Sequence, residues 1–288
     1  MFIALIKLAR PVQWLKNGVV LAALIFGGEI SHLGTVETAL IAVAIFCLLS
    51  SSVYTLNDLV DRDKDKQHPH KKDRPIASGR VSPGAAIVMV FLLLGVGLVA
   101  AWFVNLPFFV ACVVFFVLNL LYSFWLKNVV IVDVMSIALG FVFRAYAGAL
   151  AITVPASKWL LINTLLLALF LGFGKRRHEL IMLEEGAPAH RKILDKYSPY
   201  LLDQLIGVVT PAVVVLYMLY TISSEVSAKL GTESLFLTIP FVVYGIFRYL
   251  YLIHKEERGG SPTKVMIDDT PLLINVILWL ITVIFILY

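Results

Sequence analysis

The feature that most constrains this chain is a series of apolar runs, several of them close to the ~20 residues that a bilayer-spanning helix needs. Nine runs can be delimited, at residues 18–30, 36–57, 84–104, 106–126, 130–150, 158–174, 204–223, 234–253 and 271–288. Hydrophobic residues make up 60% of the chain, whereas a soluble domain contains about 45–50%. The pattern predicts an all-α polytopic membrane protein with nine transmembrane helices, built as a single domain over residues 1–288.

Basic residues are concentrated in every second link between these runs. The links after the second, fourth, sixth and eighth runs hold most of them, whereas the alternate links hold only Lys158 and Lys229. Lys7, Arg10 and Lys16 precede the first run. Because basic loops resist translocation, we expect the N-terminus in the cytoplasm and the C-terminus outside.

Two of the links expected in the cytoplasm are long and charged, at residues 58–83 and 175–203. They are the expected places for polar chemistry. The second follows Gly174 and begins K-R-R-H-E-L, which is expected to continue the sixth run as a helix. Gly186 and Pro188 are expected to end that helix.

A polar stretch from Tyr54 to Arg80 follows the second run directly. On a continuous helix, Asn57, Asp61 and Asp65 would fall at i, i+4 and i+8 and share one face. Hard oxygen ligands of this kind suit Mg²⁺, which also takes water and substrate phosphates. The alternative is a solvated basic loop, but the regular spacing favours a metal site. Asp58 would point about 100° away, so we expect it to assist rather than to ligate.

Several cations are candidates for binding phosphate. Lys71, Lys72 and Arg74 follow the carboxylates closely, and Lys175 opens the other long link. Lysine and arginine can hold phosphate oxygens directly. Lys16, at the start of the first run, is a weaker candidate. Tyr54, one turn before Asn57, is weaker too, and for both an interfacial anchor is an equally good interpretation.

Arg144 lies near the centre of the fifth run. A charge at that depth costs roughly 2.5–3.5 kcal/mol, so it should face a partner. Asp133 is 11 residues away, or about 16 Å along a helix, and cannot pair with it directly. The partner is therefore a carboxylate on another helix or a substrate phosphate. Lys127, between the fourth and fifth runs, is a second candidate for a phosphate, and Asp133 is expected to orient a cation or a hydroxyl.

The histidines and cysteines carry weaker signals. His68 and His70 flank a proline, and two histidines without further ligands make a poor metal site. His178 and His190 are expected at the surface. The cysteines lie within apolar runs, so neither a disulfide nor metal ligation is expected; they are Cys47 and Cys112.

The segment N-D-L-V-D-R-D-K-D, from Asn57 to Asp65, resembles the first aspartate-rich motif, NDxxDxxxD, of the UbiA superfamily of intramembrane prenyltransferases. Further segments resemble its decaprenyl-phosphate phosphoribosyltransferase branch: A-R-P-V-Q-W-L-K-N, H-P-H-K-K-D-R-P-I-A-S-G, L-K-N-V-V-I-V-D-V, G-F-V-F-R-A-Y-A-G and G-K-R-R-H-E-L. The resemblance covers nearly the whole chain. It implies nine helices around a central cavity that the two long links cap on the cytoplasmic side.

The same resemblance implies a reaction. Members of that branch transfer 5-phosphoribose from phosphoribosyl diphosphate to a polyprenyl phosphate, with Mg²⁺, on the cytoplasmic side of a bacterial inner membrane. The product is a lipid-linked pentose precursor for cell-envelope polysaccharide. The expected partners are therefore phosphoribosyl diphosphate, a polyprenyl phosphate and membrane lipids, without nucleic acid, and homo-oligomerisation is left open.

One departure from the prenyl-transferring members favours this branch. Those members carry a second aspartate-rich motif after the sixth helix. This chain has three basic residues there, followed by three glutamates: Lys175, Arg176 and Arg177, then Glu179, Glu184 and Glu185. A prenyltransferase with an aromatic or glycerol-phosphate acceptor remains an alternative. A transporter is another, but transporters concentrate charge near mid-membrane, and most charges here lie at one face.

The expected chemistry needs little acid–base catalysis, because a phosphate monoester with a second pKa of about 6 is already ionised. A metal ion and fixed cations would stabilise the leaving diphosphate. The expected catalytic residues are Asn57, Asp61 and Lys175, with Asn57 and Asp61 on Mg²⁺ and Asp65 either a ligand or a supporting group. Donor phosphates are assigned to Lys16, Tyr54, Lys71, Lys72, Arg74 and Lys175, and the acceptor phosphate to Lys127 and Arg144.

Overall fold

The computed structural model describes residues 2–67, 71–184, 193–257 and 259–288, and within these ranges the chain forms helices and no strand. Eight helical segments are long and apolar enough to cross a membrane. They are α3 (Leu33–Val60), α5 (Pro83–Val104), α6 (Leu106–Phe124), α7 (Val132–Ala151), α8 (Lys158–Glu184), α9 (Pro199–Ile222), η4 (Ser234–Thr238) with α11 (Ile239–His254), and α13 (Thr270–Leu287). The expected all-α fold is confirmed.

The remaining helices are short. They are α1 (Phe2–Ala9), η1 (Pro11–Leu21), α2 (Ala22–Gly27), α4 (Arg62–Gln67), η2 (Leu126–Asn128), η3 (Leu194–Lys196), α10 (Ser224–Leu230) and α12 (Pro262–Asp268). The first apolar run, residues 18–30, therefore does not form one long α-helix. It is divided between η1, which is a 3₁₀ helix, and α2.

Local geometry explains this division. Arg10 has a left-handed backbone (φ 53°) just before Pro11, and Gly28 (φ 82°) ends α2. Between these points, η1 packs against α3 and α7. A Cβ atom at Gly148 would lie 2.0 Å from the carbonyl oxygen of Val20, so the backbones of α7 and η1 meet at a glycine. This close approach accompanies the 3₁₀ conformation of residues 11–21, where the apolar run alone predicts an α-helix.

Proline and a capping side chain mark the start of several long helices. Ser82, Asn105, Ser198 and Asp269 each accept a hydrogen bond from a backbone N–H of the first turn of α5, α6, α9 and α13, respectively. Each of these helices has proline at its first or second position. Proline loses no hydrogen bond there, because the first N–H groups of a helix have no partner within it.

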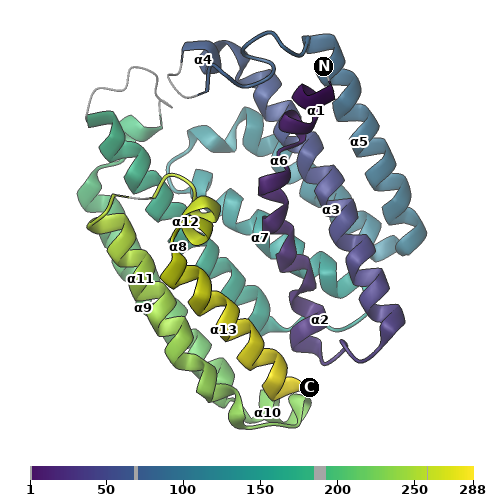
Figure 1. Cartoon of the computed structure of the whole chain (residues 1–288), viewed down its shortest axis with the longest axis vertical. Coiled ribbons are helices and arrows are strands. Elements are labelled where there is room, and N and C mark those ends of the chain that lie inside the picture. Colours follow the sequence, from purple (N-terminus) through teal and green to yellow (C-terminus); the bar gives the residue numbers. More distant parts are fainter. Residues whose placement is uncertain (1, 68–70, 185–192, 258) are drawn as a thin grey trace.

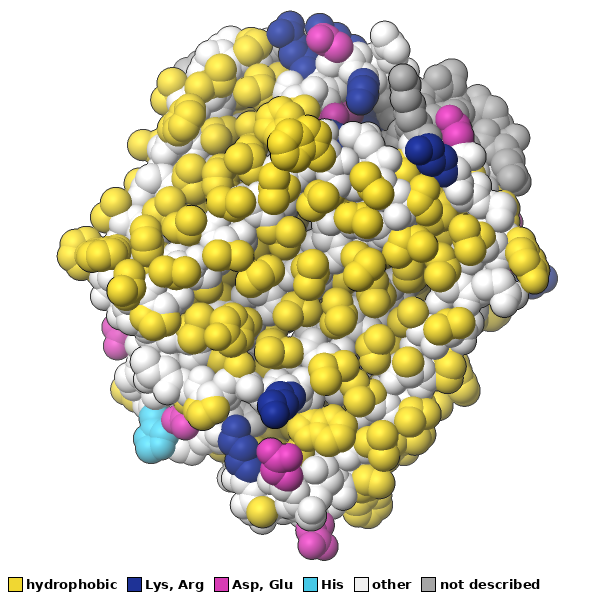
Figure 2. Space-filling view, turned by 180° about the vertical axis from the view of Figure 1, so that it is seen from behind, with side chains coloured by type: hydrophobic (Ala, Val, Ile, Leu, Met, Phe, Trp, Pro, Cys, Tyr) yellow, Lys and Arg dark blue, Asp and Glu magenta, His cyan; other side chains and the backbone are white. Residues whose placement is uncertain are grey.

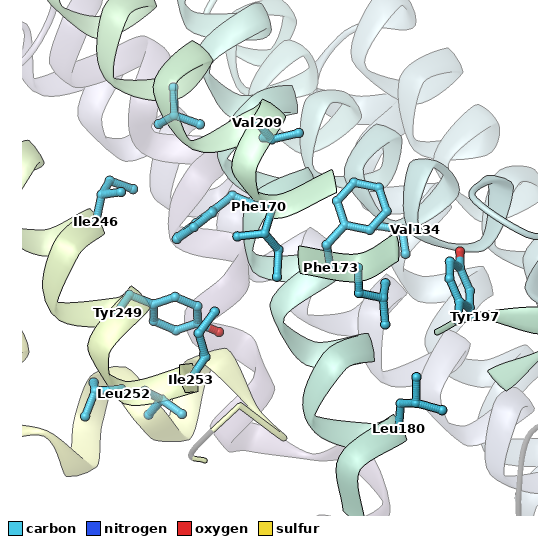
Figure 3. Packing of buried hydrophobic residues seen from close by; sticks show 14 of the residues in the cluster. Val134, Phe170, Phe173, Leu180, Tyr197, Val209, Ile246, Tyr249, Leu252 and Ile253 are labelled. Carbon is cyan, nitrogen blue, oxygen red and sulfur yellow. The ribbon is translucent and has the colours of Figure 1, made fainter. Parts of the chain in front are cut away.

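The long helices pack mostly against their neighbours in the sequence: α3 on α5, α6 on α7, α7 on α8, α8 on α9, and α11 on α13. The largest buried cluster joins α7, α8, α9 and α11, and Figure 3 shows Phe170, Phe173 and Tyr249 at its centre. A second cluster joins α3, α5, α6 and α7 around Phe46 and Phe115. The two clusters meet at α7, so this helix supports both halves.

The outer faces of the bundle are apolar. Phe91, Phe103, Val208 and Phe285 are each more than 60% exposed. Figure 2 shows a broad hydrophobic band with charged side chains gathered towards its two ends, which is the surface that a lipid bilayer would cover. The two chain ends lie at opposite ends of the long axis, the N-terminus near α4 and the C-terminus near α10 (Figure 1).

Candidate active site

Two predicted metal ligands lie where the end of α3 meets the end of α6. Ser123 donates a hydrogen bond to Oδ1 of Asn57. One turn further along both helices, Nζ of Lys127 donates to Oδ1 of Asp61 over 2.8 Å. The second oxygen of Asp61 makes no hydrogen bond to a residue that the structure describes. Asn57 and Asp61 therefore form an adjacent pair of oxygen donors, held in place by α6 and η2.

The helix does not run unbroken through this motif. It ends at Val60, Asp61 takes a non-helical conformation (φ −91°, ψ 7°), and α4 begins at Arg62. Backbone hydrogen bonds still join the N–H of Asp61 to the C=O of Asn57 at 2.9 Å, and the N–H of Asp65 to the C=O of Asp61 at 2.8 Å. The i, i+4 spacing therefore survives in the backbone, while the break redirects the chain beyond Asp61.

Asp65 points to a different set of partners from Asn57 and Asp61. Arg74 donates through the same Nη1 atom to Asp65 at 2.7 Å and to Asp58 at 2.9 Å. Asp58 also accepts from Arg10, whose guanidinium lies over the ring of Tyr54 at 5.3 Å. Both carboxylates are buried. This group ties α1, α3 and α4 to the loop after α4, so Asp65 and Asp58 act here as anchors for arginine.

Arg144 is buried without a carboxylate partner among the described residues. Its Nε atom donates to Oδ1 of Asn17 at 2.9 Å, and Nη1 donates to the carbonyl of Gly140 at 3.1 Å. Its guanidinium also lies over the ring of Phe115 at 4.6 Å. Of the two partners considered from the sequence, a carboxylate on another helix is not found among the described residues, and neutral groups surround the charge instead.

Lys16, which is in η1, lies close enough to Arg144 of α7 to feel its charge. Its ammonium group makes no hydrogen bond or ion pair with any residue in the described ranges. Burial, followed by the positive charges of Arg144 and Arg10, lowers the pKa of Lys16 to about 8. Lys16 and Arg144, which have no carboxylate partner among the described residues, form a region that favours an anion.

The start of the second long link is helical, as predicted, because α8 continues to Glu184. Lys175 is 36% exposed and lies 3.6 Å from Glu179. Arg177 pairs with Asp203 at 2.6 Å, and Asp203 also contacts His254. The predicted breaks at Gly186 and Pro188 lie outside the described residues.

Arg176 was not predicted as a site residue, and it is one of the most deeply buried charges. It is 1% exposed and donates to Oδ2 of Asp133 at 2.6 Å and to Glu179. Tyr197 donates to the other oxygen of Asp133 at 2.7 Å, and Ile131 donates its N–H to Tyr197. Burial and the contact with Asp133 raise the pKa of Tyr197. Asp133 thus orients a cation, as expected, and locks α7 to α8.

The remaining lysines, histidines and cysteines singled out from the sequence differ in how far they are buried. Lys72 is exposed and Lys71 is partly buried, in the loop that follows α4. His178, expected at the surface, is partly buried and accepts the N–H of Gly259 at 3.2 Å. His68, His70 and His190 lie outside the described residues. Cys47 and Cys112 are free thiols.

The donor set at Asn57 and Asp61 suits Mg²⁺, although no three His, Cys, Asp or Glu side chains converge on one metal position in the described ranges. Mg²⁺ uses few protein ligands and fills its shell with water and substrate phosphates. One carboxylate and one amide oxygen on adjacent turns, with an oxygen of Asp61 unbonded, meet that requirement. Asp65, the third predicted ligand, is instead bonded through Oδ2 to Arg74.

Comparison with known proteins gives a consistent result. A model of the UbiA prenyltransferase family matches residues 18–267. The chain is 32% identical to a decaprenyl-phosphate phosphoribosyltransferase of Corynebacterium glutamicum, over 99% of this chain and 86% of that protein. It is 32% identical to the enzyme of the same name from Mycolicibacterium smegmatis, over 97% of this chain and 91% of that protein.

Solved structures agree on the fold. A UbiA homologue from Archaeoglobus fulgidus, bound to GPP and Mg²⁺, superposes with a TM-score of 0.73 at 19% identity, over 98% of this chain and 99% of that one. The same homologue bound to DMAPP and Mg²⁺ gives a TM-score of 0.72. At this identity the likeness establishes the fold. Together with the apolar bundle, it makes the chain a multi-pass membrane protein.

Proposed function

The chain belongs to the UbiA prenyltransferase family, and from this premise we propose that it transfers a 5-phosphoribosyl group from phosphoribosyl diphosphate to a polyprenyl phosphate. A phosphate oxygen of the lipid forms a bond to C1 of the ribose, and the bond between C1 and the diphosphate breaks. Diphosphate leaves with the electron pair. Relatives that carry this activity in their name align over nearly the full length of the chain, which supports the proposal.

The single observation that carries the proposal is the pair of oxygen donors at the end of α3. Asn57 accepts a hydrogen bond from Ser123, and Asp61 accepts one from Lys127. These two donors would hold Mg²⁺ on the diphosphate of the donor, and the metal would neutralise charge on the leaving group. Asp65 and Asp58 would act indirectly, because they fix Arg74 at the edge of the same site. The other proposed contacts to donor phosphates are Lys16, Tyr54, Lys71, Lys72 and Lys175.

The residues of α8 support a phosphoribosyl rather than a prenyl donor. A second metal cluster would need carboxylates near the start of the second long link, and Glu179, which lies there, is already paired with Arg176 and Lys175. Arg176 is also committed to Asp133, and Arg177 to Asp203. Lys175 is left partly exposed and suits a phosphate contact. A wholly polar donor would enter from the aqueous side, while the acceptor's tail would stay among the apolar helices.

The acceptor phosphate is assigned to Lys127 and Arg144. Arg144 has a buried charge without a carboxylate, so a phosphate dianion would complete its environment. The acceptor needs no general base, because its phosphate is ionised at neutral pH. Fixed cations near the reacting groups are worth more in a site from which water is excluded.

The proposal extends to topology. We place residues 18–30 as a ninth crossing, with the N-terminus in the cytoplasm and the C-terminus outside, around a central cavity that opens to the cytoplasm. The basic residues of the long links support this orientation. The site would then face the cytoplasm of a bacterial inner membrane, and the product would supply pentose for cell-envelope polysaccharide.

The proposal is tested by offering the purified protein both classes of donor. Radiolabelled phosphoribosyl diphosphate with a panel of polyprenyl phosphates should give labelled lipid and diphosphate, and only with a divalent metal present. A prenyl diphosphate with an aromatic or glycerol-phosphate acceptor should give no product. Prenyl transfer without ribose phosphate transfer would contradict the proposal and favour the alternative, a prenyltransferase.

A further inference from the structure

Lys127 occupies a position that conflicts with a metal ion on Asp61. Its ammonium nitrogen lies 2.8 Å from Oδ1 of Asp61, and the two side chains are 9% and 23% exposed. The ion pair is thus largely shielded from water. A divalent cation on the same carboxylate would stand close to the ammonium group, and like charges repel strongly where water is scarce. Although a metal could use the other oxygen of Asp61, the two cations would share one carboxylate, and each would weaken the binding of the other.

The other carboxylates around the site offer Lys127 no second partner. Asp58 and Asp65 are bonded to Arg74, and Asp133 is bonded to Arg176 and Tyr197. These three carboxylates are buried, and each accepts hydrogen bonds from an arginine. The bond from Lys127 is a single contact from a flexible chain. A displaced Lys127 would therefore need an anion from outside the protein.

The backbone of Lys127 allows such a movement. It lies in η2, a 3₁₀ turn of three residues between α6 and α7. Trp125 and Val129, on either side of this turn, have non-helical backbones. The neighbouring contact at Asn57 comes from Ser123, a neutral hydroxyl that also bonds within its own helix. Of the two side chains that hold the proposed metal ligands, only Lys127 carries a charge that a metal would oppose.

We propose that Lys127 is a resident counter-ion of Asp61 that a bound divalent cation displaces, so that metal binding delivers the ammonium group to the phosphate of the lipid acceptor. This inference rests on the metal site of the proposed function. It makes the binding of metal and of lipid phosphate cooperative, and thermodynamic linkage requires each to favour the other.

The first test measures metal binding without substrate. Mn²⁺, a paramagnetic substitute for Mg²⁺, is titrated into the purified full-length protein in detergent and followed by electron paramagnetic resonance. Lys127→Met and Lys127→Gln should both bind Mn²⁺ at least about 5-fold more tightly than the wild type, because the competing cation is gone. Lys127→Arg keeps the positive charge and should bind Mn²⁺ as weakly as the wild type. Lys229→Met, in α10 at the opposite end of the bundle, is the matched control and should not change binding.

The second test measures the coupling itself. Binding of a radiolabelled polyprenyl phosphate, in the absence of donor, should become several-fold tighter when Mg²⁺ is added to the wild type. The same addition should have no effect on Lys127→Met. Equal or weaker Mn²⁺ binding by both neutral variants would overturn the exchange, because Lys127 would then support Asp61 rather than compete with metal.

A third variant, Asp61→Asn, shows whether a negative result refutes only the exchange at Lys127 or also the metal site of the proposed function. If Asp61→Asn loses Mn²⁺ binding while the Lys127 variants leave it unchanged, the metal site stands and the exchange is wrong. If Asp61→Asn binds Mn²⁺ as well as the wild type, the metal site and the exchange are both wrong. Gel filtration and thermal unfolding of each variant show that the folded protein is being compared.

Discussion

Lys127 lies 2.8 Å from Asp61, and 66 residues of chain separate the two. The same separation joins Ser123 to Asn57, one helical turn earlier. The ends of α3 and α6 are therefore in register, with Asn57 facing Ser123 and Asp61 facing Lys127. This alignment gives the motif its shape, because it fixes two oxygen donors before any metal arrives.

Asp61→Asn should remove metal-dependent activity while the protein stays folded. The substitution keeps the size of the side chain but removes the charge that would hold a divalent ion. We expect kcat/KM to fall by at least about 100-fold, with little change in the apparent Tm, because Asp61 is not part of a packed core. Asp63→Asn is the control, since Asp63 is 86% exposed and forms a surface ion pair with Lys66. Near-normal turnover of Asp61→Asn at ordinary Mg²⁺ would refute the assignment.

Tyr197→Phe should destabilise the link between α7 and α8. The hydroxyl donates to buried Asp133 and accepts the N–H of Ile131, so its loss leaves both groups short of a partner. Such a loss costs about 1–3 kcal/mol, and we expect a fall of a few degrees in the apparent Tm. Tyr200→Phe, at a position that is 74% exposed, should have no effect. Thermal unfolding in detergent gives the comparison.

Most of the fold could be predicted from the sequence. The run at 84–104 becomes α5 (Pro83–Val104), and the run at 271–288 becomes α13 (Thr270–Leu287). Caps and prolines mark such ends, so their boundaries can be read locally. The run at 18–30 differs, because tight packing at Gly148 and the turn at Arg10 divide it. Neither effect leaves a signal in hydropathy.

The sequence could suggest candidate residues for the site but not their pairings. The spacing within the motif identified Asn57 and Asp61, yet nothing local indicates that Ser123 and Lys127 face them. The commitment of Arg176 to Asp133 also crosses between helices. A run of three basic residues looks uniform in the sequence, and only packing shows which of them is buried. Pairing between helices depends on register, which one sequence alone does not reveal.

Donor binding should weaken in alkaline solution because of Lys16. Its pKa is lowered to about 8, so the side chain is charged below that pH and neutral above it. Loss of the charge would remove the proposed phosphate contact, so kcat/KM for phosphoribosyl diphosphate should fall about fivefold between pH 8 and pH 9. The Lys16→Arg variant stays charged, so its kcat/KM should not change between pH 8 and pH 9. If Lys16→Arg shows the same decline, another group is responsible.

The orientation in the membrane can be tested with two single cysteines. Gln67 is exposed at the end of α4, and Lys229 is exposed in α10, at the opposite end of the bundle. In a variant without Cys47 and Cys112, we expect Lys229→Cys to react with an impermeant thiol reagent applied to intact cells. Gln67→Cys should react only after the membrane is opened. The reverse pattern would invert the proposed topology.

Arg144 and Lys175 should affect different substrates. Arg144 is buried among neutral partners, whereas Lys175 lies partly exposed at the start of the second long link. If they bind the acceptor and donor phosphates, respectively, Arg144→Ala should raise KM mainly for the polyprenyl phosphate. Lys175→Ala should raise KM mainly for phosphoribosyl diphosphate. A charge-assisted hydrogen bond is worth about 1.5–3 kcal/mol, so each loss should be roughly 10- to 100-fold.

The decisive comparison is the ratio of the two KM changes, measured with each substrate varied while the other is saturating. A purely structural role for Arg144 would lower kcat and leave the ratio near that of the wild type. Arg144→Lys retains the charge and should recover part of the lipid affinity, although it cannot reproduce the bonds to both Asn17 and Gly140. Equal effects of Arg144→Ala on both substrates would show that this residue supports the fold of α7, and would leave Lys127 as the assigned contact to the acceptor.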